Sequence, residues 1–428
     1  MTFTPIDWKV HRLDELGFVG RGRSRHRPRN DPSLYGGSYP FVQTSDIKAA
    51  NLRLREFTQT YNETGLAQSK MWATGTLCIT IAANIAETAI LAISACFPDS
   101  VIGFIADPKK ADTVFIKHYI DFIKLQMQQV SHGTTQDNLS LDKLLRFDFV
   151  VPEAPVQRKI ASILSAYDDL IENNLRRIKV LEEMAQTLYR EWFVKFRFPS
   201  HQKVKMVNSP LGKIPEGWEV GTLDDVLATL ESGSRPKGGI DPEARGMPSI
   251  GAENIIGLGR YDYSKEKFVT REFFDNMNRG HIQSGDVLLY KDGAQIGRKS
   301  MFRDGFPHAE CCINEHVFIM RTNGRCSQNY LFFWLDQPEM TQNIINLNAN
   351  AAQPGINQSG VRGLSILLPP TPLLEIAEQV LEPMLGVLFN NAKRNNVLCQ
   401  TRDLILPKLI SGELDVSELD ITIPEANA

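Results

Sequence analysis

One stretch of the chain, residues 156–192, limits the possible folds more than any other. It contains no proline and no glycine, and the first such residue after it is Pro199. A segment without these two residues can form one uninterrupted helix. At 1.5 Å per residue the helix would span about 55 Å, which is longer than most helices inside a domain. We therefore predict a long spacer helix that needs a partner.

The apolar residues of this stretch recur in steps of three and four, which is the period of a coiled coil. Asn174 occupies one position of the seam, and a single asparagine in such a seam usually fixes the register of pairing. The partner is predicted to be a second helix near the C-terminus. The residues predicted to pair the helices are Ile160, Leu164, Tyr167, Ile171, Asn174, Ile178, Leu181 and Leu188 in the first helix and Leu388, Asn391, Leu398 and Ile405 in the second.

An internal repeat supplies this second helix. Adding 217 to the residue number leads from the first helix to its copy, and a shift near 210 relates the segments at the start of each repeat. Matches that include a proline, an asparagine, a tryptophan and a glycine in one order rarely arise by chance. An internal repeat should be identified before the fold is predicted, because it determines the whole architecture. The matched pairs include Pro152 with Pro369, Asn174 with Asn391, Trp8 with Trp218, and Gly75 with Gly285.

The chain is thus predicted to alternate two globules with two helices. Each globule combines strand-like segments, such as 75–81 and 285–290, with helix-like segments at 113–130 and 328–345. The predicted boundaries are 1–155 for the first globule, 156–198 for the central spacer helix, 199–372 for the second globule, 373–412 for the C-terminal spacer helix and 413–428 for a tail.

Composition restricts the class of protein. The chain has 428 residues, of which 42% are hydrophobic and 23% charged, as in an ordinary globular protein. Its apolar stretch at 80–97 is broken by Asn84, Glu87 and Ser94, so no membrane span is predicted. No signal-peptide core opens the chain, and the six cysteines show no metal-binding or disulfide spacing. These features favour the cytoplasm.

The net charge of −3 means that any binding of nucleic acid must come from local clusters. Arginine is the residue best suited to phosphate oxygens and guanine edges. Five arginines at alternate positions would share one side of an extended segment, namely Arg21, Arg23, Arg25, Arg27 and Arg29. The alternative is a solvated loop without a ligand. The matching loop of the second repeat, 232–239, carries Arg235 and Lys237.

Further candidates for DNA contact are polar residues in turns next to strands. Glutamine and asparagine can form two hydrogen bonds with adenine, although loop amides more often stabilise turns. The Gly-rich segment 291–299 could offer donors to DNA or could be a plain hairpin. The candidates are Gln43, Gln136, Lys291, Gln295, Arg298, Lys299, Gln353 and Asn357.

Two other classes of protein are alternatives, a metal-dependent nuclease and a coiled-coil scaffold. A metal-dependent nuclease uses two carboxylates and a lysine, and Asp99, Asp107 and Lys109 follow in that order, but Pro108 would break the strand they need. Phosphate-binding and zinc-protease motifs are absent, and Leu368-Pro369-Pro370-Thr371 lacks the amide or carboxylate of a methyltransferase motif. A coiled-coil scaffold that does not bind DNA remains an alternative, although the globules make up most of the chain.

The order and duplication of several segments resemble the specificity subunit of type I restriction-modification systems. These segments are 40–47, 75–81 with 285–297, 135–152 leading into 157–161, 171–174, 188–193, 211–223 and 404–416, so the resemblance covers nearly the whole chain. It implies two tandem target-recognition domains of mixed α/β type, separated by two long antiparallel coiled-coil helices.

The resemblance also implies a non-catalytic DNA-recognition subunit without a cofactor or metal of its own. Such a subunit reads a bipartite site in double-stranded DNA, with one domain for each half and an unread gap set by the helices. Two modification subunits then use S-adenosylmethionine to methylate adenine N6. Restriction subunits use ATP and Mg to translocate and cleave DNA.

Overall fold

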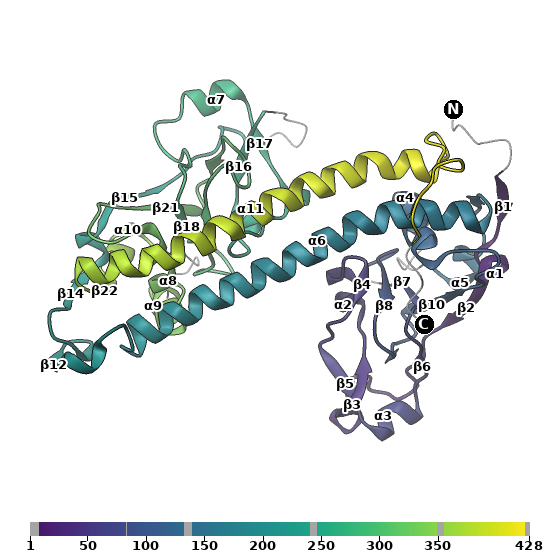
Figure 1. Ribbon diagram of the computed structural model, residues 1–428, viewed down its shortest axis with the longest axis horizontal. Coiled ribbons are helices and arrows are strands. Elements are labelled where there is room, and N and C mark those ends of the chain that lie inside the picture. Colours follow the sequence, from purple (N-terminus) through teal and green to yellow (C-terminus); the bar gives the residue numbers. More distant parts are fainter. Residues whose placement is uncertain (1–7, 83, 132–138, 240–245, 349–354, 424–428) are drawn as a thin grey trace. The chain divides into compact units, whose positions relative to one another are not determined.

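The computed structural model describes residues 8–82, 84–131, 139–239, 246–348 and 355–423 (Figure 1). The chain forms two compact units, of which the first comprises Met1–Asn173 with Val397–Ala428 and the second Asn174–Asn396. Within the described residues, no helix is both long and apolar enough to cross a membrane.

Two long helices, α6 (Ala154–Tyr189) and α11 (Thr371–Ile410), confirm that the chain contains the two predicted long helices. Each begins one residue before a proline, Pro155 or Pro372, in the first turn, where the missing N–H has no partner to lose. A π-helical turn, η2 (Arg190–Val194), continues α6. α11 ends before Gly412, whose φ of +76° suits a glycine after a helix.

The two helices pair in antiparallel orientation within each unit. In the second unit the amide of Asn174 donates a buried hydrogen bond of 2.9 Å to Oδ1 of Asn395. In the first unit Asp168 of α6 pairs with Arg402 of α11. From one pair to the other the residue number rises along α6 and falls along α11, as antiparallel pairing requires. An asparagine pair therefore lies in the seam, where the sequence predicted a register-fixing asparagine.

Most of the predicted seam is buried, but at one position the fully buried residue is a neighbour of the predicted one. Asp168, and not Tyr167, occupies the buried position between Leu164 and Ile171, because the steps there are four and three rather than three and four. Charged residues are seldom buried unless they are paired, so the sequence favoured the tyrosine. The fully buried predicted residues are Ile160, Leu164, Ile171, Asn174, Ile178, Leu388 and Asn391, and the half-buried ones are Tyr167, Leu181, Leu188, Leu398 and Ile405.

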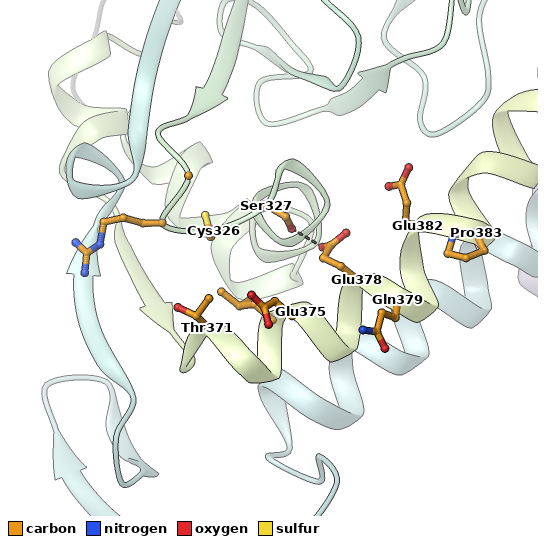
Figure 2. Close-up of a pocket in the computed structure, with 11 residues that line it drawn as sticks. Cys326, Ser327, Thr371, Glu375, Glu378, Gln379, Glu382 and Pro383 are labelled. Atoms are coloured by element: carbon orange, nitrogen blue, oxygen red, sulfur yellow. Dashed lines mark hydrogen bonds between the residues drawn. The ribbon is translucent and has the colours of Figure 1, made fainter.

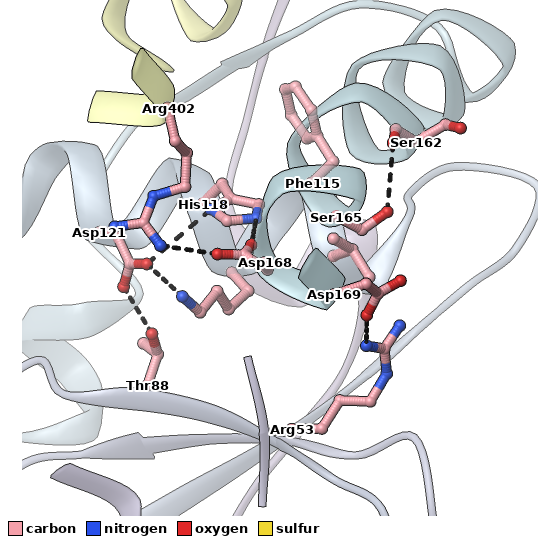
Figure 3. Close-up of polar contacts among 12 residues, drawn as sticks. Arg53, Thr88, Phe115, His118, Asp121, Ser162, Ser165, Asp168, Asp169 and Arg402 are labelled. Carbon is pink, nitrogen blue, oxygen red and sulfur yellow. Dashed lines mark hydrogen bonds and ion pairs between the residues drawn. The ribbon is translucent and has the colours of Figure 1, made fainter. Parts of the chain in front are cut away.

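Asp168 is buried because two other elements of the first unit supply its partners (Figure 3). Its carboxylate lies 2.6 Å from Nη1 of Arg402 in α11 and 3.1 Å from Nε2 of His118 in α4 (Thr113–Ser131). Asp121 lies beside this pair and accepts a 2.6 Å bond from Lys117. The cluster joins both long helices to the globular part of the same unit.

In the first unit a five-stranded sheet of order β2-β10-β7-β8-β4 packs beside a smaller sheet of order β5-β3-β9-β6, and a ribbon β1-β11 leads into α6. The strands are β1 (Lys9–His11), β2 (Gly17–Arg21), β3 (Tyr35–Phe41), β4 (Arg53–Leu54), β5 (Gln59–Tyr61), β6 (Met71–Trp72), β7 (Leu77–Thr80), β8 (Thr88–Leu91), β9 (Ala95–Cys96), β10 (Val101–Ala106) and β11 (Phe149–Val151). The short helices are α1 (Leu13–Leu16), η1 (Pro32–Leu34), α2 (Thr44–Ala49), α3 (Glu63–Ala67) and α5 (Leu141–Leu144).

The second unit repeats this plan with the sheet β15-β21-β18-β19, the sheet β17-β16-β20 and the ribbon β14-β22, and adds a hairpin β12-β13. Its strands are β12 (Met206–Ser209), β13 (Gly212–Pro215), β14 (Glu219–Thr222), β15 (Leu227–Ser232), β16 (Met247–Ile250), β17 (Phe268–Val269), β18 (Asp286–Tyr290), β19 (Lys299–Phe302), β20 (Cys312–Ile313), β21 (Val317–Thr322) and β22 (Ser365–Leu368). Its shorter helices are η3 (His201–Lys203), η4 (Leu223–Asp225), η5 (Ala252–Asn254), η6 (Tyr263–Lys265), α7 (Arg271–Asp275), α8 (Gln328–Leu335), α9 (Pro338–Asn346) and α10 (Gln358–Arg362).

Strand pairing supports the internal repeat, because matching strands pair with each other in both units. Leu77 of β7 lies opposite Ile90 of β8, and Val287 of β18 lies opposite Met301 of β19. Both small sheets contain one parallel pair, β3 with β9 and β16 with β20. The mixed α/β class and the paired long helices are as predicted, whereas the finer division into recognition domains, spacers and tail stays a prediction.

A buried amide nitrogen of α11, Nδ2 of Asn391, has no hydrogen-bond partner, and this carries a stability prediction. Asn391 corresponds to Asn174, but the register that pairs Asn174 with Asn395 places Asn391 opposite Ile178, and its buried Nδ2 atom makes no hydrogen bond. An unsatisfied buried donor costs about 1–3 kcal/mol. We expect Asn391→Leu to raise the free energy of unfolding by about 1 kcal/mol, as measured by urea denaturation. Asn174→Leu is the control and should destabilise, because it removes the buried hydrogen bond that Asn174 donates to Asn395; a loss of stability in both variants would contradict this account.

Candidate nucleic-acid interface

In the first unit the basic loop after β2 converges on one carboxylate. Asp99, in the turn between β9 and β10, pairs with the guanidinium groups of Arg29 and, at 3.7 Å, Arg27. Nε of Arg21 donates to the backbone oxygen of the same aspartate. The Arg27 and Arg29 side chains are about half exposed, at 54% and 50%, while that of Asp99 is 29% exposed. The loop thus presents guanidinium groups above a deeper carboxylate.

The predicted single row of five arginines is wrong. β2 ends at Arg21, and the irregular segment after it turns Arg23 back so that its guanidinium donates to the carbonyl of Ser69. Arg25 is exposed, and only its backbone N–H is bonded within the fold, to Oε1 of Gln68. Alternation places residues on one side only where the backbone stays extended.

A hydrogen bond between His26 and Asp31 shapes the same loop. Nε2 of His26 lies 2.8 Å from the carboxylate of Asp31. The backbone N–H of Ser33, helped by the Ser33 side chain and His26, lowers the pKa of Asp31 to about 2. Asp31 therefore remains charged at neutral pH and anchors the end of the loop. Gln43, at the start of α2, is half-buried, and its amide donates to Gln59.

In the second unit four loops meet around His316. Its Nδ1 lies 3.1 Å from Asp292 and its Nε2 lies 3.4 Å from Glu315. Glu315 also pairs at 3.1 Å with Arg235, and Asp292 with Lys291. The carbonyl of Lys291 accepts the N–H of Ile356, next to the candidate Asn357. The structure thus brings together Arg235, Lys291 and the loop of Asn357.

The Gly-rich turn exposes Gln295 and Arg298 but buries Lys299. Both exposed residues line a surface pocket of about 570 Å³. Nζ of Lys299 donates to Thr341 at 2.7 Å and lies 3.8 Å from Asp336, and burial lowers the pKa of this ammonium group. Lys299 therefore supports the turn from inside and does not offer its charge to the surface.

The remaining candidates differ in position. Lys237 is exposed in the loop after β15. Asn357 is exposed too, but its side chain caps α10 by accepting the N–H of Gly360 at 2.7 Å, as the turn-forming alternative proposed. Gln136 and Gln353 lie outside the described residues.

Sequence reasoning missed the acidic members of these clusters. Asp99 was considered only as part of a nuclease motif, but its carboxylate is taken up by Arg27 and Arg29. Glu315 and His316 were not singled out at all. In the part of the chain that the structure describes, no three His, Cys, Asp or Glu side chains are placed to hold a metal ion. The signal that could have found the acidic residues is the repeat, because Asp99 and Glu315 occupy matching turns.

An acidic pocket in the second unit is unsuited to DNA phosphates (Figure 2). It encloses about 700 Å³ between the segment 324–327 and the first turns of α11, where Glu375, Glu378 and Glu382 line it. Glu378 accepts hydrogen bonds from Ser327 and Asn329, and Glu382 pairs with Arg303. These carboxylates would repel a phosphate backbone, so the basic loops remain the candidate interface.

Comparison with known proteins gives a consistent result. Residues 5–183 match the family described as "Type I restriction modification DNA specificity domain". The chain is 25% identical over 431 residues to the type I restriction enzyme MjaIX specificity subunit of Methanocaldococcus jannaschii, an alignment that covers 97% of this chain and 95% of that protein. It is 21% identical over 347 residues to the HindI specificity subunit of Haemophilus influenzae, covering 66% and 72% of the two chains.

A solved structure shares the fold. The S subunit of the type I restriction-modification system from M. genitalium superposes with a TM-score of 0.57, covering 96% of this chain and 97% of that one. The sequence identity of 14% limits the likeness to the fold.

Proposed function

We propose, from the premise that this chain belongs to the family of type I restriction-modification specificity subunits, that each of its repeats reads one half of a bipartite DNA site. The chain is the DNA specificity subunit of such a system and is not itself catalytic. The observation that carries the bipartite proposal is the repeat itself. Two related globular folds with different loop residues can read two different half-sites from one chain.

The basic loops supply the chemistry of this recognition. Arginine and lysine contacts to phosphates give affinity, and contacts to base edges give specificity. The half-exposed Arg27 and Arg29 in the first repeat and Arg235 in the second can serve both purposes. Arg298 and Gln295 stand exposed at the Gly-rich turn and are the proposed base readers of the second repeat.

The partners are proposed to be two modification subunits and the restriction subunits. In this proposal, S-adenosylmethionine, ATP and Mg belong to those partners and not to this chain. Apolar side chains on the outer faces of the long helices suit docking of the modification subunits. The most exposed of them are Leu170, Val180 and Met184 on α6 and Val387, Val397 and Leu404 on α11. We propose further that the paired helices set the length of the unread gap.

A map of N6-methyladenine tests the proposed function. We would compare DNA from cells that express this chain with its modification subunit and DNA from cells that lack this chain. A motif with two fixed halves and a constant gap, present only with the chain, is the expected result. DNA without chain-dependent methylation, together with an assembled complex that binds no DNA, would contradict the proposal.

Replacement of two exposed arginines tests the first basic loop. The double variant Arg25→Ala/Arg27→Ala should weaken binding of the assembled complex to target DNA by at least tenfold, and the salt slope should fall by about two, one for each lost phosphate contact. Titrations of labelled duplex at several salt concentrations measure both quantities. Lys109→Ala is the matched control, because Lys109 follows β10 at the end away from Arg21. Unchanged affinity and slope in the double variant would remove this loop from the interface.

A further inference from the structure

We infer that Asp99 and Glu315 are specificity-determining residues, because each carboxylate neutralises the basic loop of its own repeat and so limits binding to non-target DNA. The inference rests on the proposed function as a DNA-recognition subunit. Both residues lie outside the set that sequence reasoning selected for DNA contact.

The two carboxylates occupy the same place in the repeat. Asp99 lies in the turn between the parallel-paired strand β9 and strand β10, and Glu315 in the turn between β20 and β21. β10 pairs with β2 and β21 pairs with β15, so the loop after β2 and the loop after β15 leave the sheet beside these turns. The carboxylate meets the basic loop in both cases.

Close backbone packing holds each loop against its turn. A Cβ atom on Gly22 would lie 2.3 Å from the carbonyl oxygen of Pro98, and one on Gly233 would lie 1.7 Å from that of Ile313. Any side chain at these two matching positions would therefore collide with backbone. Because glycine permits this approach in both repeats, the meeting of basic loop and acidic turn is a built feature and not a chance contact of mobile side chains.

The repeats keep the charge arrangement while the residues change. In the first repeat Asp99 contacts Arg27 and Arg29, and in the second Glu315 contacts Arg235 and His316. The carboxylate side chains are 29% and 31% exposed, and the arginines 50% to 58%. The arginines can therefore meet DNA while the carboxylates stay beneath them. Ion pairs this exposed contribute little to stability, which leaves recognition as their main effect.

Complexes with non-target DNA and with target DNA use the loop charges differently. Binding to non-target DNA is almost wholly electrostatic and needs the loop charges at phosphates. A carboxylate that already shares those guanidinium groups opposes such contacts. At the target the guanidinium groups are aimed at base edges, and an arginine has enough donors to bind a base and the carboxylate together. Each carboxylate therefore weakens non-target binding more than target binding.

The test uses Asp99→Asn and Glu315→Gln in the complete chain, assembled with its modification subunits. Kd is measured for the target duplex and for duplexes in which one half-site or the other is scrambled. We expect Asp99→Asn to reduce discrimination at one half-site at least fivefold, and Glu315→Gln to reduce it at the other, with a gain in affinity for the scrambled duplex. Each variant is thus the control for the other.

Two exposed acids of the same units control for net charge, and Asp142→Asn and Glu339→Gln should leave discrimination unchanged. Unchanged discrimination in Asp99→Asn and Glu315→Gln would overturn the inference. An equal loss at both half-sites from either variant, or the same loss in the controls, would also overturn it, since only net charge would then matter. A wild-type complex without any half-site preference would instead refute the proposed function.

Discussion

Replacing Arg402 with alanine should lower the free energy of unfolding by about 3 kcal/mol, because it leaves a buried carboxylate without its main charged partner. The Asp168 side chain is 1% exposed, and Arg402 reaches it at 2.6 Å from the other long helix. His118 remains at 3.1 Å in the variant, which keeps the loss at the lower end of the range for a broken buried pair. Urea denaturation of the complete chain, followed by circular dichroism, measures the effect.

The same pair should make the first unit sensitive to acid. Burial by itself would raise the pKa of Asp168, but the His118 imidazole and the charges of Lys117 and Arg402 outweigh it and lower the pKa to about 2. The unfolded value is about 3.9, so the stabilisation is complete above that pH and is lost as the pH falls from about 4 to 2. The stability difference between the wild type and Asp168→Asn should therefore shrink within this window.

The second repeat contains a control for this prediction. Its matching positions hold Phe333, Leu385 and Ala185 in place of His118, Asp168 and Arg402, and all three are buried in one apolar cluster. The triple variant His118→Phe/Asp168→Leu/Arg402→Ala places the same three apolar side chains in the first unit. It should be at least as stable as the wild type, because apolar packing often equals or exceeds a buried ion pair. A triple variant less stable than Arg402→Ala alone would contradict the argument.

The burial of charged side chains could not be predicted from the sequence. The long helices followed from the absence of proline and glycine, and the repeat followed from matched asparagine, proline and tryptophan residues. The burial of Asp168 was not predicted, and Lys299 was expected to face DNA, because burial of a charge depends on partners from distant segments, such as Arg402 for Asp168 and Asp336 for Lys299. No local period reveals such partners.

The candidate interface was also predicted only in part from the sequence. Sequence reasoning identified the basic loops, and the structure places Arg27, Arg29 and Arg235 in exposed positions. Sequence reasoning did not identify Asp99 and Glu315 as parts of these loops, because a carboxylate near arginines in space can be far from them in sequence. Strand pairing brings them together, and pairing between distant strands is a property of the whole fold.

Lengthening both helices should lengthen the gap in the recognised DNA. Three heptads inserted after Leu175 in α6 and after Arg394 in α11 keep the seam in phase, and the Asn174–Asn395 pair shows that these points lie opposite each other. The insertion adds about 31 Å to each helix. That length corresponds to about nine base pairs, close to one turn of DNA, so a half-site moved by this distance returns to nearly the same side of the duplex. Selection from a duplex library with fixed half-sites and variable gaps measures the preferred spacing.

A one-heptad insertion at the same two points separates a ruler from a flexible tether. It adds about 10 Å, or about three base pairs, which turns the second half-site by roughly 100° around the DNA axis. If the helices act as a rigid ruler, this shorter insertion should bind more weakly than the three-heptad variant, although it changes the chain less. An insertion in α6 alone should abolish the pairing and with it any sharp gap preference. Retention of the original gap by both paired insertions would refute the proposal that the helices measure the distance between half-sites.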